Sequence, residues 1–310
     1  QAHMLSLAQK PHKYPLALLQ AVCIALGAYI GIYSLLLIPY GTFLYSNQGA
    51  LPEYGLNNLP LWASIFSLFD SPHVITGGLI VLALLGFALC IGVQSPLIPL
   101  FAWVLYVSFQ NRNVLTEHPG TDVIGLVLLF VTLAFFIKKY YSPNQNLPSQ
   151  VLMLPALLYE GMWIVVGLAF TASGVARIRG ESWIGGTGIA EMFSIMPIRH
   201  NPVSEFLQRE IIALPHAIIS LLTYSAELIF IFALPLALFK QTRSFLLLAL
   251  TFMYFIVLII SDMSQIILAL FILFLLLADV LLPYERYLPR SIRTSISRIV
   301  RYRFFWNQKL

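Results

Sequence analysis

The sequence predicts an all-α integral membrane protein with about eight transmembrane helices and both termini in the cytoplasm. Of its 310 residues, 59% are hydrophobic and only 10% are charged, whereas soluble domains carry about 25% charged residues. The hydrophobic residues form continuous runs, and most of these runs approach the length of about 20 residues that a helix needs to cross a bilayer. These runs are continuous, so they do not show the alternation of a membrane β-barrel.

Eight apolar runs give the expected spans: residues 15–38, 74–93, 97–109, 123–137, 151–175, 211–239, 244–260 and 265–283. The first run is too long for the core of a signal peptide and is expected to remain as an anchor. The third run is short and contains Pro99. It is therefore expected to form either a half-helix or a tight hairpin with the second run.

The positions of the basic residues orient these spans, because lysine and arginine are enriched in cytoplasmic loops. With a cytoplasmic N-terminus and eight spans, thirteen of the 18 lysines and arginines lie inside and five lie outside. The net charge of +5 is therefore expected to face anionic lipid rather than nucleic acid. Residues 1–3 are expected to be a tag remnant, 4–283 the transmembrane domain, and 284–310 a basic amphipathic cytoplasmic tail.

Composition excludes several classes of protein. So apolar a chain cannot hide its surface as a soluble enzyme, and it resembles neither a disordered chain nor a disulfide-rich secreted module. The two cysteines, Cys23 and Cys90, lie in apolar runs and are expected to be buried free thiols. No metal-ligand spacing is present, so no metal is predicted.

Two outer segments, residues 39–73 and 176–210, are longer than turns and are expected to carry function or a lid. The second contains Trp183 and several glycines, and its apolar middle is expected to re-enter the membrane surface. Asn201 followed by Pro202 is typical of a helix start, so a helix is expected to run from there into the sixth span. The tryptophans and tyrosines of these segments serve equally well as interfacial anchors.

Two carboxylates lie inside expected spans, where charges are costly and usually face a cavity or a partner. Counted from the inner ends of their spans, Glu160 and Glu227 lie at similar depth, so they are expected to share a polar cavity and to take part in proton transfer. The alternative is that each acid makes a helix–helix contact. His216 in the sixth span and His118 in an outer loop are candidate bases, with a packing role as the alternative.

The second outer segment and the span before it resemble a signature of the vitamin K-dependent gamma-carboxylase family, whose bacterial branch carries the HTTM (horizontally transferred transmembrane) domain. The resemblance covers roughly residues 10–283. The residues that carry it are Tyr159, Gly161, Gly174, Arg177, Ser182-Trp183 and Gly186-Thr187, with Ser67-Leu68-Phe69, Gln110-Asn111-Arg112-Asn113, Gly120, Asp122 and Glu227-Leu228 matching in order.

The resemblance implies a quinol-dependent oxidoreductase, or a carboxylase-like or epoxidase-like enzyme that modifies a peptide at the outer face of a bacterial inner membrane. The candidate catalytic residues are Glu227 and Arg177, which match the family pattern, together with Glu160, which is a candidate because it lies inside an expected span. The substrate or quinone would contact Trp183, Arg179, Arg199, His200, His118 and His216. The implied cofactor is a quinol of the vitamin K type, and the implied partners are the bilayer, a peptide or protein substrate, and a membrane or soluble protein.

Two other functions remain open. By this resemblance, Arg177, or Arg179 in an alternative alignment, stands where the family has its catalytic lysine, and arginine does not lose its proton at useful pH. The first alternative is therefore a non-catalytic membrane scaffold or peptide-maturation partner. A transporter is the least favoured, because the sequence shows no inverted repeat and no paired broken helices.

Overall fold

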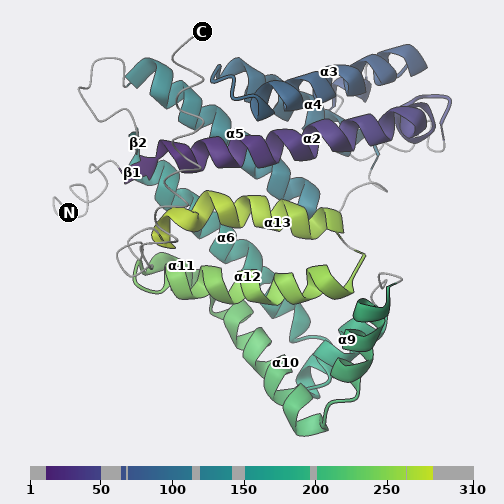
Figure 1. The fold of residues 1–310 in the computed structure, drawn as a ribbon, viewed down its shortest axis with the longest axis vertical. Coiled ribbons are helices and arrows are strands. Elements are labelled where there is room, and N and C mark those ends of the chain that lie inside the picture. Colours follow the sequence, from purple (N-terminus) through teal and green to yellow (C-terminus); the bar gives the residue numbers. More distant parts are fainter. Residues whose placement is uncertain are drawn as a thin grey trace.

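The computed structural model describes residues 12–49, 64–67, 69–113, 119–141, 151–195, 201–262 and 264–281. Helices dominate this part of the chain (Figure 1). The longer ones are α2 (Leu16–Tyr45), α3 (Pro72–Cys90), α4 (Leu97–Arg112), α5 (Pro119–Tyr141), α6 (Ala156–Arg177), α10 (His216–Ile231), α12 (Arg243–Ile260) and α13 (Ser264–Leu277). The shorter ones are η3 (Ile65–Ser67), α7 (Glu181–Ile184), α8 (Gly188–Ile195), α9 (Pro202–Ile212) and α11 (Ala233–Leu238). Strands β1 (His12–Pro15) and β2 (Val151–Leu154) pair in antiparallel fashion.

The lengths of the helices confirm the predicted class at a coarse level. Among the described residues, α2, α3, α5, α6 and α12 are long and apolar enough to cross a membrane. A sixth span results if α9 and α10 count as one, although they are bent by 102° relative to each other. α4 and α13 are shorter apolar helices. The chain is therefore an all-α protein with several helices of membrane-spanning length.

Glycine contacts hold α2 and α3 together along an antiparallel crossing. A Cβ atom added at Gly27 would lie 2.4 Å from the carbonyl oxygen of Gly86, and one at Gly86 would lie 2.6 Å from the backbone nitrogen of Gly31. Small residues let helix backbones approach closely where lipid gives no hydrophobic drive for association. In Figure 1, α3 lies along one side of α2 and α13 along the other, with α12 beyond α13.

The fifth expected span, residues 151–175, is wrong at its start. Val151–Leu154 forms β2, paired with β1 so that His12 lies opposite Leu154. Proline restricts the residue before it to extended conformations, which suits Leu154 ahead of Pro155 and delays the helix. α6 consequently begins at Ala156 and continues to Arg177.

The sixth expected span, residues 211–239, is also wrong as a single helix. Its first residues end α9, and the chain turns at Ala213–Pro215 before α10 begins. Figure 1 shows α10 leaning away from α12 to meet α9 in a V. The prediction of a helix at Asn201 and Pro202 is confirmed, because the Asn201 side chain accepts a hydrogen bond from the backbone N–H of Ser204 at 2.9 Å.

A second break separates α10 from α11 and follows from Pro235. Proline has no N–H to donate to the carbonyl four residues earlier, which is that of Ile231. The Thr171 hydroxyl of α6 donates to this carbonyl at 3.3 Å and accepts from the backbone N–H of Leu234 at 2.9 Å. The neighbouring helix thus satisfies the freed backbone, as buried breaks in lipid require.

The outer segments differ from their expected limits. α2 continues through Pro39 to Tyr45, so the first outer segment begins later than residue 39. Residues 189–195 of the second segment belong to the helix α8. The expected tag remnant at 1–3, residues 50–63 of the first segment, and the tail at 284–310 lie outside the described residues. Cys23 and Cys90 are both free thiols, Cys23 buried and Cys90 partly so.

Candidate functional site

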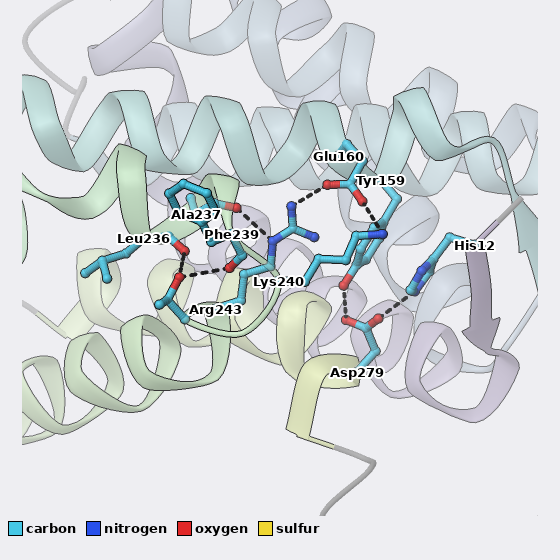
Figure 2. Close-up of polar contacts among 10 residues, drawn as sticks. His12, Tyr159, Glu160, Leu236, Ala237, Phe239, Lys240, Arg243 and Asp279 are labelled. Carbon is cyan, nitrogen blue, oxygen red and sulfur yellow. Dashed lines mark hydrogen bonds and ion pairs between the residues drawn. The ribbon is translucent and has the colours of Figure 1, made fainter. Parts of the chain in front are cut away.

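One polar cluster surrounds the start of α6, where the turn between α11 and α12 meets β1 and the end of α13 (Figure 2). We call it the basal network; it consists of His12, Tyr159, Glu160, Lys240, Arg243 and Asp279. Within it, Arg243 donates a hydrogen bond to the Glu160 carboxylate. Lys240 Nζ lies 3.3 Å from the other carboxylate oxygen. Glu160 is therefore paired through both oxygens.

Arg243 is the buried centre of this network. Its Nε donates to the Ala237 carbonyl at 2.7 Å, which ties the end of α11 to the start of α12. Its guanidinium lies 5.2 Å from the centre of the Trp163 ring. Arg243 is only 2% exposed, whereas the Lys240 side chain is 75% exposed. Arg243 thus fixes Glu160 from the protein side and Lys240 approaches it from outside.

Asp279, which lies just after α13, is the second acid of the basal network. Its two carboxylate oxygens lie 2.8 Å from His12 Nε2 and 2.9 Å from the Tyr159 hydroxyl, which donates to it. The His12 and Tyr159 rings stack with their centres 3.7 Å apart. Nearby, the Tyr14 hydroxyl donates to the Leu276 carbonyl at 2.6 Å. Burial, with the charge of Asp279 adding to it, holds the pKa of Tyr14 well above its usual value.

The expected cavity shared by Glu160 and Glu227 is wrong. Glu160 lies near the start of α6, whereas Glu227 is under the electrostatic influence of Arg177, the last residue of that helix. Arg177 lies seventeen positions after Glu160, which corresponds to about 25 Å along the helix at 1.5 Å per residue. Glu160 lies at the opposite end of α6 from Arg177, and both of its carboxylate oxygens are paired with cations. We therefore interpret the basal network as a set of structural contacts between helices.

A second polar cluster lies where α6 ends, and we call it the Arg177 site. Its members are Arg177, Trp183, Glu227, Phe230 and Tyr254. The Arg177 guanidinium lies 4.1 Å from the centre of the Phe230 ring and 4.8 Å from that of Trp183. Its charge also acts on the Tyr254 hydroxyl and on the Glu227 carboxylate. Two aromatic faces therefore hold a fixed positive charge next to an acid and a phenol.

Glu227 differs from the other acids of the described chain in its surroundings. It is 8% exposed, and both carboxylate oxygens are shielded without a hydrogen-bond partner. Buried carboxylates are normally paired or hydrogen-bonded, because an isolated charge is costly away from water. Arg177 supplies charge nearby but no direct ion pair with Glu227. Such a group has its full capacity to accept a proton or a hydrogen bond.

The loop that carries Trp183 is shaped by glycine. Gly186 has φ of +74°, which other residues rarely adopt, and the Thr187 N–H returns to the Ser182 carbonyl at 2.8 Å. At Gly188, an added Cβ would lie 2.5 Å from the Trp183 ring. The Tyr224 hydroxyl of α10 donates to the Ile184 carbonyl at 2.9 Å, fastening α7 over the site. This packing sets the position of the indole.

The structure thus brings together three of the predicted site residues, Arg177, Trp183 and Glu227, and separates Glu160 from them. His216 is exposed at the first residue of α10, with its Nδ1 3.2 Å from the Ser220 hydroxyl. Arg179 is exposed just beyond α6. His118, Arg199 and His200 lie outside the described residues.

The residues that sequence reasoning missed are aromatic. Phe230 and Tyr254 lie inside apolar runs, where they are indistinguishable from packing residues. A spacing signal did exist for Phe230, which lies three residues after Glu227 and so shares its helix face. Asp279 also takes part in a polar cluster, and its contacts with His12 and Tyr159 join residues that are far apart in the sequence.

In the part of the chain that the structure describes, no group of three His, Cys, Asp or Glu side chains is placed to hold a metal ion. Comparison with protein-family models, curated proteins and solved structures finds no match.

Proposed function

We propose that this chain is a membrane-embedded oxidoreductase that acts on a quinol at the outer face of a bacterial inner membrane, through the Arg177 site. The observation that carries the proposal is the Glu227 carboxylate, which is buried, unpartnered and next to an arginine held between two aromatic rings. The resemblance to the vitamin K-dependent gamma-carboxylase family supports the same assignment through Arg177, Trp183 and Glu227.

The arrangement in the membrane is part of this proposal. Eight spans are obtained when α4, α13 and the α10–α11 pair each count as one crossing beside the five long helices. The alternation then puts Lys138, Lys139 and the Lys240–Arg243 turn on one side and Arg177 on the other. The larger basic group marks the cytoplasmic side, so the Arg177 site faces outward and both termini are cytoplasmic.

The chemistry of the site suits a ring that carries hydroxyl groups. A quinol supplies an acidic ring hydroxyl and two electrons, for which the resemblance implies dioxygen as the acceptor. Glu227 can accept the hydroxyl proton, since neither oxygen is engaged elsewhere. Arg177 stays charged at any useful pH and stabilises negative charge on the ring oxygen. The Trp183 face offers a stacking surface for the ring.

The proposal is tested by measuring turnover with a reduced short-chain quinone on purified protein in lipid nanodiscs. Glu227→Gln keeps the size of the side chain but cannot accept a proton, so turnover should fall by roughly 10²–10⁴-fold while binding changes little. Glu191→Gln, an exposed acid on α8, is the matched control and should match the wild type. Wild-type protein that neither binds nor oxidises the quinol, or Glu227→Gln with normal turnover, would contradict the proposal.

The second candidate is a non-catalytic scaffold or peptide-maturation partner, favoured by arginine in the position of the family's lysine. Arg177 is held by Phe230 and Trp183, which also suits a structural role. On this alternative, Arg177→Lys gains no activity, wild-type protein oxidises no quinol, and a stoichiometric protein partner co-purifies. On the enzyme proposal, turnover is present in the wild type and needs no partner. A peptide substrate at the outer face is compatible with both.

A further inference from the structure

A third group of polar side chains lies between α2 and α4, apart from the basal network and the Arg177 site. Tyr29 and Tyr33 belong to α2, and their rings stack nearly parallel with centres 5.8 Å apart. Tyr106 and Gln110 lie one turn apart on α4. The side chain of Tyr29 lies within hydrogen-bonding reach of Tyr106, and that of Tyr33 within reach of Gln110. We call these four residues the tyrosine cluster.

The cluster contains polar atoms whose hydrogen bonding within the protein is incomplete. The hydroxyls of Tyr29 and Tyr106 and the Oε1 atom of Gln110 are shielded, and none of them makes a hydrogen bond of normal geometry. Tyr106 is 1% exposed. An unsatisfied polar atom inside a membrane protein is costly, and phenylalanine would fill the same space without that cost. Three such atoms in one place point to a bound molecule that pairs with them.

The character of the cluster limits what this molecule can be. Its four side chains are neutral, so they do not compensate the buried charge of an ion. Tyr29 and Tyr33 stack on each other, so a flat ring does not fit between them. The groups offer both donors and acceptors over a short span, which matches water, and buried water typically makes about three hydrogen bonds to such groups.

Polar groups continue from the cluster toward the C-terminal end of α4. Tyr33 also interacts with Tyr45, near the end of α2. Two residues beyond Gln110, the buried Arg112 lies 3.8 Å from the Asp70 carboxylate, which is partly exposed. This continuation links the cluster to the end of the bundle where α2 and α4 finish.

We propose that the tyrosine cluster is a hydration site, in which ordered water bridges the hydroxyls of Tyr29 and Tyr106 and the amide of Gln110 between α2 and α4. The proposal rests on shielded polar atoms of α2 and α4 that make no hydrogen bond of normal geometry. It does not depend on the function assigned to the Arg177 site.

The first measurement is thermal unfolding of Tyr106→Phe. If water bridges the hydroxyl, its removal breaks a bonded network and the melting temperature falls by roughly 2–4 °C. If the hydroxyl is dry and unpaired, its removal relieves a cost and the melting temperature rises, which overturns the proposal. Tyr40→Phe is the matched control, because Tyr40 is an exposed tyrosine of α2, and it should leave the melting temperature unchanged.

The second measurement separates water from a direct bond between the two phenols. Radiolytic labelling in ¹⁸O-water marks side chains that contact bound water. The Tyr106 ring should be labelled several-fold more than Tyr14, a buried tyrosine whose hydroxyl is satisfied by the Leu276 carbonyl. Equal and low labelling of Tyr106 and Tyr14 overturns the proposal even if Tyr106→Phe is destabilising, because a direct bond to Tyr29 then accounts for the loss.

Discussion

The Asp279 carboxylate accepts a hydrogen bond from the Tyr159 hydroxyl at 2.9 Å. This bond joins the segment that follows α13 to the start of α6, across 120 residues of sequence. The same carboxylate lies 2.8 Å from His12, just before α2. One buried acid therefore connects three segments that the chain order leaves far apart. Removing the acid leaves both the Tyr159 hydroxyl and the His12 ring without this hydrogen-bond partner. Substitution of Asp279 therefore tests whether these contacts stabilise the fold.

We expect Asp279→Leu to lower the stability of the purified protein by about 1–3 kcal/mol for the lost partner of Tyr159, with a further loss at His12. Asp279→Asn keeps polar atoms in both positions and should lose less. Asp262→Leu alters an exposed acid between α12 and α13 and serves as the control. Thermal unfolding followed by tryptophan fluorescence measures the series. An Asp279→Leu protein as stable as the Asp262→Leu protein would show that these contacts do not hold the segments together.

Arg243 and Lys240 both pair with Glu160, but they should contribute very unequally to the free energy of unfolding. Arg243→Met removes a buried guanidinium that also binds the Ala237 carbonyl, so we expect a loss of about 3 kcal/mol or more. Lys240→Met removes an exposed amine, and exposed ion pairs are worth about 0–1 kcal/mol. Unfolding of both variants at low and high salt measures the difference. Similar losses, or a strong salt dependence of the Arg243 contribution, would contradict the burial of this pair.

The start of α6 explains why one candidate acid could be placed from sequence and the other could not. Counting depth from residue 151 puts Glu160 in mid-membrane, but Val151–Leu154 is a strand, so the count begins in the wrong place. The strand depends on pairing with His12–Pro15, which lies more than a hundred residues away. The local sequence pattern does not reveal a pairing partner so far away in the chain. An apolar run of four residues is compatible with either a strand or part of a helix.

Features fixed by neighbouring residues could be predicted better. The Asn201–Pro202 helix start needs only its own turn, and the structure contains it. Each long helix also overlaps one of the apolar runs, although α2 continues to Tyr45 and α6 begins only at Ala156. The members of the Arg177 site could be predicted only in part, because Arg177, Trp183 and Glu227 stand out as polar or family-like residues. Tyr254 is recruited by packing of α12 and looks like any aromatic in an apolar run.

The crossing of α2 and α3 should be intolerant of a single methyl group. Gly27→Ala would put a Cβ 2.4 Å from the Gly86 carbonyl oxygen and 2.6 Å from the Cys90 nitrogen, both of them backbone atoms. We expect a loss of about 1–3 kcal/mol, the usual cost of overpacking. The control is Gly77→Ala on α3, which meets nothing within 4 Å and should be neutral or slightly stabilising. A well-folded Gly27→Ala protein of normal melting temperature would argue against this close approach.

The position of Trp183 should control the Arg177 site without any change to the residues that touch a ligand. Gly188→Ala would place a Cβ 2.5 Å from the Trp183 ring, so the indole must move away from its present place beside Arg177. We expect quinone affinity to fall about tenfold or more, because the aromatic face and the fixed charge lose their alignment. Gly161→Ala on α6 meets nothing within 4 Å and provides a matched control that should bind normally. Binding is measured by titration in nanodiscs, with circular dichroism to verify that both variants fold. Equal affinity in the two variants would show that the Trp183 ring is not part of the ligand's surroundings.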